Sequence, residues 1–131
     1  MVETSAIIDY LRGKKEAVEG LENLEGEICG SFVCLGELYE GIVRSKDKGK
    51  AESAVKMFFS GLSLVYGLDE ETAENFGKIR ADLRQRGRVI EDLDILIAAT
   101  CKAHDLILIT QDIKHFSMVK DLKIYKILKE G

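Results

Sequence analysis

The chain has no apolar run near the ~18 residues that a helix needs to cross a lipid bilayer. Its first residues, 1–5, lack a basic stretch followed by an apolar core, so no secretory signal is visible. Proline and tryptophan are absent, and no repeat or low-complexity segment divides the 131 residues. We therefore expect one cytoplasmic domain over residues 1–131, large enough to bury about two-thirds of its unfolded surface.

Cysteine and histidine are too few to suggest a metal centre of sulfur and nitrogen ligands. Cys29, Cys34 and Cys101 form no C-x-x-C pair and stand among apolar or small residues, which favours buried, reduced thiols. The two histidines, His104 and His115, are not spaced as ligands on one helix face, so a zinc site is disfavoured. We expect His104 to end a helix and His115 to face solvent.

The chain also lacks a basic excess, since 23 Asp and Glu outweigh 19 Lys and Arg for a net charge of −4. Nucleic-acid-binding proteins normally show a basic surface. Two divalent cations would bring the charge to about zero, so the balance argues only against tight RNA binding by the metal-free protein. Two basic clusters remain as solvated surface or as RNA contacts: Arg80, Arg84, Arg86 and Arg88, then Arg44, Lys46, Lys48 and Lys50.

Strand and helix patterns alternate along the chain, which predicts an α/β domain with a mainly parallel sheet of four to five strands. The strand-like runs are 2–3, 27–33, 62–66, 106–109 and 123–127. Apolar residues at helical spacing mark 4–11, a second piece ending near 24, then 35–42, 48–62, 69–86 and 92–104.

Asp94 is the carboxylate most out of place. It lies in a run from Leu93 to Ala99 that is apolar on every side, as in a helix buried on all faces. A desolvated carboxylate is costly unless a cation, a metal or hydrogen bonds compensate, and no Lys or Arg occurs between Asp92 and Cys101. Backbone amides at the helix start are an alternative partner, although Asp92 is better placed as the cap.

Three more acids follow predicted strands: Glu3 after the first, Glu37 after the second and Asp112 after the fourth. Parallel strands bring their carboxyl ends to one sheet edge, where ligands bind. Crowded carboxylates take up protons or hold hard cations, and oxygen ligands select magnesium or manganese. Alternatives stay open, because Glu3 could be an exposed terminal residue, Asp112 could shape a turn, and periodicity does not distinguish Glu37 from Glu40.

Four segments, in order, resemble the motifs of PIN domains. They are Glu3–Arg12, where an acid, Thr and Ser precede an apolar helix; Glu37–Gly41; Gly87–Ile90 followed by Asp94–Ala99; and Thr110–Asp112 with Phe116. One such motif is weak, whereas four at compatible spacing over nearly the whole chain are specific. The length and pattern most resemble VapC toxins, which are metal-dependent endoribonucleases neutralised by a cognate antitoxin.

The resemblance implies a single PIN-like domain with three layers, α/β/α. It implies Mg²⁺ or Mn²⁺ held by four acids, and hydroxyl support from Thr4 or Ser5 and from Thr110. The four acids are Glu3, Glu37, Asp94 and Asp112. The implied reaction is in-line attack of a metal-activated water on an RNA phosphodiester, without a side-chain nucleophile.

The resemblance also implies protein partners, namely an antitoxin and a second copy of the chain in a homodimer. Apolar positions near Tyr10, Tyr39 and Phe59 are candidate contacts for either partner, although core packing explains them equally well. The RNA target depends on loops and shape, and the acids do not reveal it.

The chain departs from the family pattern at Glu3, where PIN domains have Asp, and only two residues precede it. The extra methylene can shift a ligand by about an ångström, enough to cost ~100-fold in rate. A second hypothesis therefore stays open, a degenerate PIN module that binds RNA or protein without cleavage. A receiver-like phosphoacceptor domain fits poorly, because Gly67 and Leu68 follow the middle strand where an Asp is required.

Overall fold

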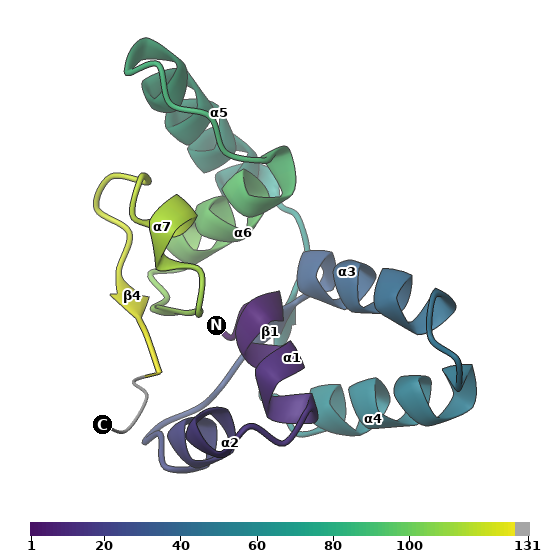
Figure 1. Cartoon of the computed structure of the whole chain (residues 1–131). Coiled ribbons are helices and arrows are strands. Elements are labelled where there is room, and N and C mark those ends of the chain that lie inside the picture. Colours follow the sequence, from purple (N-terminus) through teal and green to yellow (C-terminus); the bar gives the residue numbers. More distant parts are fainter. Residues whose placement is uncertain (128–131) are drawn as a thin grey trace.

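A computed structural model describes residues 1–127, in which helices surround short parallel strands (Figure 1). The helices are α1 (Thr4–Leu11), α2 (Lys15–Glu22), α3 (Phe32–Val43), α4 (Lys48–Ser60), α5 (Glu70–Gln85), α6 (Asp92–Ala103) and α7 (Ile113–Phe116). The strands are β1 (Gly30–Ser31), β2 (Val65–Tyr66), β3 (Leu108–Ile109) and β4 (Ile124–Tyr125). Every expected helix and strand therefore has a counterpart within a few residues, except that residues 2–3 contribute only a single bridge at Val2.

The sheet consists of two strand pairs with the amino-terminal residues between them. β1 pairs with β2, and β3 pairs with β4, both in parallel. Val2 forms a parallel bridge with Ile109, and its N–H donates to the carbonyl of Cys29 at 2.9 Å. The order across the sheet is therefore β2, β1, residues 1–3, β3, β4. β1 and β2 lie on one side of residues 1–3, and β3 and β4 lie on the other. In open α/β sheets, ligands bind at the carboxyl ends of the two neighbouring strands from which the chain continues in opposite directions, here residues 1–3 and β3.

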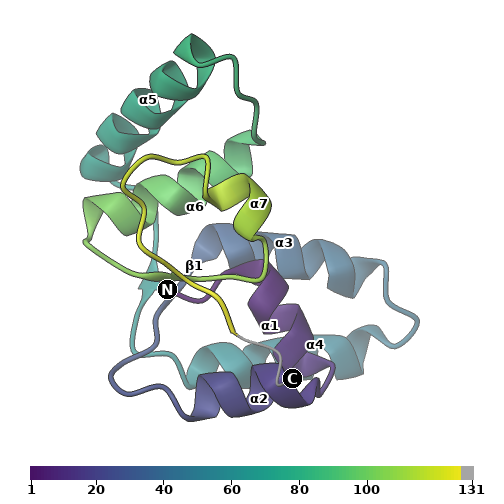
Figure 2. The same ribbon diagram turned by 60° about the vertical axis from the view of Figure 1, so that its left-hand side comes forward.

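The sheet carries a hydrophobic cluster on each face, because successive residues of a strand point to opposite sides. Met1 and Leu108 pack into the cluster that α5, α6 and α7 cover. Val2 and Ile109, one residue further along, pack into the cluster formed with α1, α2 and α4. Figure 2 shows α5 and α6 on one side of the strands and α2 and α4 on the other. The expected three-layer architecture is confirmed.

Two local expectations were wrong. Residues 32–33 do not continue the second strand, because the hydroxyl of Ser31 accepts from the N–H of Cys34 at 3.1 Å and starts α3 at Phe32. Asp92 does not cap α6, since Glu91 holds that position and Asp92 pairs with Arg80 at 3.2 Å. None of the helices within residues 1–127 is both long and apolar enough to span a membrane.

The three cysteines are buried free thiols, as expected. Burial raises the pKa of Cys34 to about 11 and that of Cys101 to about 12. Because the thiolate is the reactive form, these two cysteines act as small apolar residues of the core.

Candidate active site at the carboxyl edge of the sheet

Glu3 lies where the amino-terminal residues leave the sheet, and it caps α1. Its side chain is buried, so the alternative of an exposed terminal residue is wrong. One carboxylate oxygen, Oε2, accepts from the N–H of Ser5 at 3.1 Å. The other, Oε1, accepts from the hydroxyls of Ser5 and Thr110, each at 2.5 Å. Glu3 therefore joins the carboxyl ends of two neighbouring sheet positions, residues 1–3 and β3.

Glu37 lies in the second turn of α3 and is half-buried. Its Oε1 accepts from the hydroxyl of Thr4 at 2.7 Å. Burial raises the pKa of Glu37 and nearby carboxylates add to the rise, whereas the bond from Thr4 opposes it. Glu40 is exposed on the same helix. Tertiary packing thus distinguishes the two glutamates that helical periodicity left equivalent.

Asp94 and Asp112 line one cavity of about 320 Å³. The same cavity is also lined by Val89, Ile90, Glu91 and His115. Burial is the largest cause that raises the pKa of Asp94 to about 6, and the other contributions come from acids, in the order Glu3, Glu37, Asp112 and Glu91. The structure thus brings Asp94 into the electrostatic field of the other three predicted acids. Backbone amides at the helix start do not account for it, because a carboxylate satisfied in that way would have a lowered pKa.

His115 lines this cavity and also faces solvent as expected, since 46% of its side chain is exposed. Its Nδ1 lies 2.9 Å from Oδ2 of Asp112, and its N–H donates to Oδ1 of the same side chain at 3.3 Å. The sequence argument missed the contact with Asp112 because 113–116 forms a short helix, α7, that Asp112 caps and periodicity did not reveal. In the sequence, the Asp-x-x-His spacing of Asp112 and His115 could have indicated this contact. His104 does end its helix, as expected.

Among residues 1–127, no three His, Cys, Asp or Glu side chains are already arranged as metal ligands. Thr4 donates to Glu37, Ser5 and Thr110 donate to Glu3, and His115 contacts Asp112. A bound cation would have to share these oxygens or displace some of the bonds. The donor chemistry fits a hard divalent cation, because the groups are carboxylates and a positive charge would favour the ionised form of Asp94, whose pKa is raised by burial and then by neighbouring acids.

The four candidate RNA-contact arginines fall into two pairs. Arg80 is bound by Asp92, and Arg86 is bound by Asp82 at 2.7 Å and by a backbone carbonyl. Arg84 and Arg88 form no ion pair with a described residue, and they line a cavity of about 240 Å³ together with Arg80 and Asp92. That cavity shares Val89 and Ile90 with the acidic cavity, so the two lie side by side.

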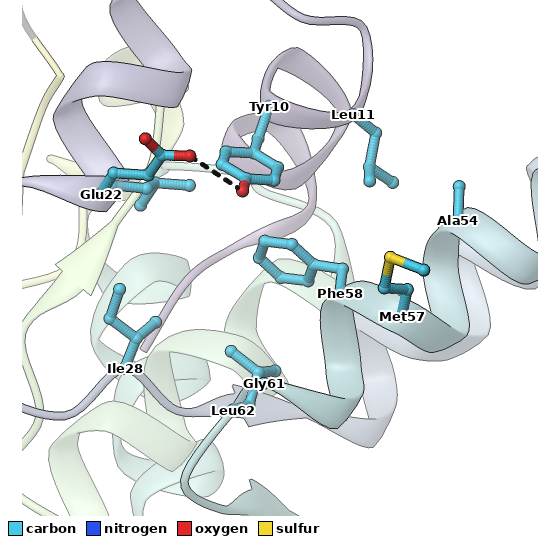
Figure 3. A pocket seen from close by; sticks show the side chains of 10 residues that line it. Tyr10, Leu11, Glu22, Ile28, Ala54, Met57, Phe58, Gly61 and Leu62 are labelled. Carbon is cyan, nitrogen blue, oxygen red and sulfur yellow. Dashed lines mark hydrogen bonds between the residues drawn. The ribbon is translucent and has the colours of Figure 1, made fainter.

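Two apolar hollows lie along α4. One, of about 400 Å³, lies between α1, α2 and α4, and Figure 3 shows Tyr10 and Phe58 side by side in its wall. Their ring centroids are 5.2 Å apart. The other, of about 500 Å³, lies between α1, α3 and α4 and has Glu37 in its wall. Ala54 lines both hollows, so we call them together the α4 groove.

The fold and the site together define a class, an α/β domain of doubly wound type with an acidic pocket where the strand order reverses. The model of the PIN domain family matches residues 1–122, and the chain belongs to that family. The receiver-like alternative is therefore wrong.

Among known proteins, the chain is similar to Ribonuclease VapC1 of Methanocaldococcus jannaschii, with 35% identity over 127 residues, which cover 95% of this chain and 85% of that protein. It is 30% identical over 124 residues to the tRNA(fMet)-specific endonuclease VapC of Shigella flexneri, covering 94% and 93%. A solved structure of VapBC2 from Rickettsia felis, bound to a DNA fragment from the promoter, matches with a TM-score of 0.89 at 27% identity over 96% of each chain. The resemblance to VapC proteins is confirmed.

Proposed function

We propose that this protein is a Mg²⁺- or Mn²⁺-dependent endoribonuclease and the toxin of a toxin–antitoxin pair. The observation that carries the proposal is the raised pKa of Asp94 in a cavity open to solvent, surrounded by other carboxylates. Carboxylates that are brought together in a cavity, with the pKa of one raised by burial and by the others, are typical of functional sites. The similar proteins include a ribonuclease and a tRNA endonuclease, which supports RNA as the substrate.

In this proposal Glu37, Asp94 and Asp112 hold the cation, with Glu3 as the fourth acid at the base of the site. The bound cation would supply an activated water and stabilise the leaving oxygen. The hydroxyl of Thr4 donates to Oε1 of Glu37 and so orients this carboxylate, which leaves Oε2 for a ligand. Buried Thr110 accepts from the N–H of Asp112 at 2.9 Å and so sets the turn that brings Asp112 to the cavity.

The test is cleavage of labelled RNA by the purified chain with Mn²⁺, and its loss when EDTA replaces the metal. Asp105→Asn is the matched control for acid-to-amide changes. Asp105 is exposed, pairs only with Lys123 among the described residues, and has a φ of 51° that asparagine tolerates. RNA that is bound and left uncut with Mn²⁺ would instead support the degenerate binding module.

We propose Arg84 and Arg88 as contacts to RNA phosphates, because their cavity adjoins the acidic one. The double change Arg84→Ala, Arg88→Ala is expected to raise KM about tenfold with kcat nearly unchanged, since the lost contacts bind substrate and transition state alike. The salt dependence of RNA binding should fall by about one unit per lost phosphate contact. Arg86→Ala, whose guanidinium is already bound by Asp82, is the control. A drop in kcat without a change in KM would contradict this role.

We propose that the antitoxin covers the α4 groove, because the walls of the groove are mostly apolar and a protein partner would bury them. A partner there would contact Glu37 and reach the site directly. Ala54→Glu is expected to weaken inhibition by the cognate antitoxin at least tenfold without changing RNA cleavage. Ser53→Glu, exposed and outside both hollows, should leave inhibition unchanged. Equal inhibition of both variants would exclude the groove.

The homodimer stays a prediction, and light scattering distinguishes one chain from two.

A further inference from the structure

Glu3 is the most heavily hydrogen-bonded of the four acids. Each carboxylate oxygen has two lone pairs. Oε1 uses both, because the hydroxyls of Ser5 and Thr110 donate to it. Oε2 uses one for the N–H of Ser5. At most one lone pair of Glu3 therefore remains for any ligand. The other acids are half-buried and contact fewer protein groups: Glu37 accepts from the hydroxyl of Thr4, and Asp112 contacts two nitrogen atoms of a single residue, His115.

The bonds to Glu3 orient the two hydroxyls for a second task. A hydroxyl has one proton, and both protons point to Glu3. The lone pairs of the hydroxyl oxygens therefore face away, and the oxygen of Ser5 accepts from the N–H of Gln111 at 3.0 Å. The oxygen of Thr110 accepts from the N–H of Asp112 at 2.9 Å. Through these two hydroxyls, the carboxylate of Glu3 thus holds the backbone N–H groups of Gln111 and Asp112 in place.

We infer that Glu3 acts in this chain as a positioning residue, which clamps residues 110–112 through Ser5 and Thr110 and so sets the place of Asp112. The inference rests on the proposed function for its catalytic consequence. It reverses the expectation that Glu3 is a weakened substitute for Asp. An aspartate would withdraw the carboxylate by one carbon–carbon bond, about 1.5 Å, and stretch bonds of 2.5 Å past hydrogen-bonding distance.

Two substitutions of Glu3 separate the clamp from direct metal ligation. Glu3→Gln keeps the length, so its amide oxygen still accepts from both hydroxyls, whereas its NH₂ group, a donor, replaces the oxygen that accepts from the N–H of Ser5. We expect Mn²⁺ affinity by calorimetry, and kcat, to stay within about tenfold of the unchanged protein. Glu3→Asp should lose about a hundredfold in kcat, the scale of a one-ångström displacement. A direct ligand requires the opposite order, so Glu3→Asp equal to or better than the unchanged protein, with Glu3→Gln inactive, overturns the inference.

A second readout needs neither metal nor RNA. In EDTA, amide hydrogen exchange at Gln111 and Asp112 should quicken at least tenfold in Glu3→Asp and stay unchanged in Glu3→Gln. Thr110→Val removes the hydroxyl at nearly the same volume and should reproduce the faster exchange, and Thr110→Ser should restore slow exchange. Unchanged exchange in Thr110→Val overturns the clamp.

The exchange experiment also distinguishes failure of the proposed function from failure of the clamp. A chain that never cuts RNA refutes the proposed function, and the exchange rates still decide whether Glu3 clamps the turn. Should Glu3→Asp fail to fold, the Thr110→Val and Thr110→Ser pair tests whether the hydroxyl that donates to Glu3 holds the N–H of Asp112, and unchanged exchange at Asp112 in Thr110→Val overturns the clamp. Because Glu3 acts through Thr110, combining Glu3→Asp with Thr110→Val should slow cleavage no further than the worse single change.

Discussion

Asp94→Asn is expected to stabilise the metal-free fold and to abolish RNA cleavage in the same protein. The folded-state pKa of Asp94 is raised to about 6 from its usual 3.8, first by burial and then by neighbouring acids. The folded protein therefore binds this proton more tightly than the unfolded chain does. The resulting stabilisation is present below pH 3.8 and is lost as pH rises through about 6. At neutral pH the ionised carboxylate opposes folding, and asparagine removes the charge while keeping the shape.

The measurement compares melting temperatures in EDTA at neutral pH and near pH 4. The variant should melt a few degrees higher at neutral pH, and this advantage should disappear at the lower pH. RNA cleavage with Mn²⁺ should fall at least about a hundredfold, because a metal ligand supports several kcal/mol of transition-state stabilisation. Asp105→Asn should show neither effect. Cleavage by Asp94→Asn at the rate of the unchanged protein would refute the metal-site assignment.

Divalent cations are expected to raise the melting temperature of the unchanged protein strongly. A cation that binds only the folded state stabilises it by about 2.7 kcal/mol at a hundred times its dissociation constant, which corresponds to roughly 10 °C for a domain of this size. The effect should be largest above pH 6, where Asp94 is ionised, and should fade toward pH 5 because protons and the cation compete for the same oxygens.

Calorimetry with millimolar Mn²⁺ at pH 5 and pH 7.5 provides the check, with Ca²⁺ as a test of selectivity. Asp94→Asn should lose most of the metal-dependent shift, and Asp105→Asn should keep it. An identical melting temperature with and without Mn²⁺ at pH 7.5 would show that the carboxylates do not form a metal site.

Local sequence patterns predicted most helices and strands because their signals are local. Apolar spacing located α5 and α6, and the short apolar run before Thr110 located β3. Asp94 was identifiable because a charge in a run of apolar residues conflicts with its surroundings. Ser31 shows the limit, since whether its hydroxyl ends a strand or caps a helix depends on geometry over three residues.

Pairings between distant residues could not be inferred in this way. Thr4 reaches across 33 positions to Glu37, and Thr110 reaches across 107 positions to Glu3. Neither contact leaves a mark in the neighbouring sequence.

The amino-acid order was thus enough to establish the α/β class, the order of elements and the acids of interest, because periodicity and the cost of a buried charge act over a few residues. Which acids face one cavity, and what each carboxylate oxygen binds, depended on the folded chain. Those properties arise when the carboxyl ends of residues 1–3 and β3 are brought together, and the hydrogen bonds that result join residues far apart in the chain.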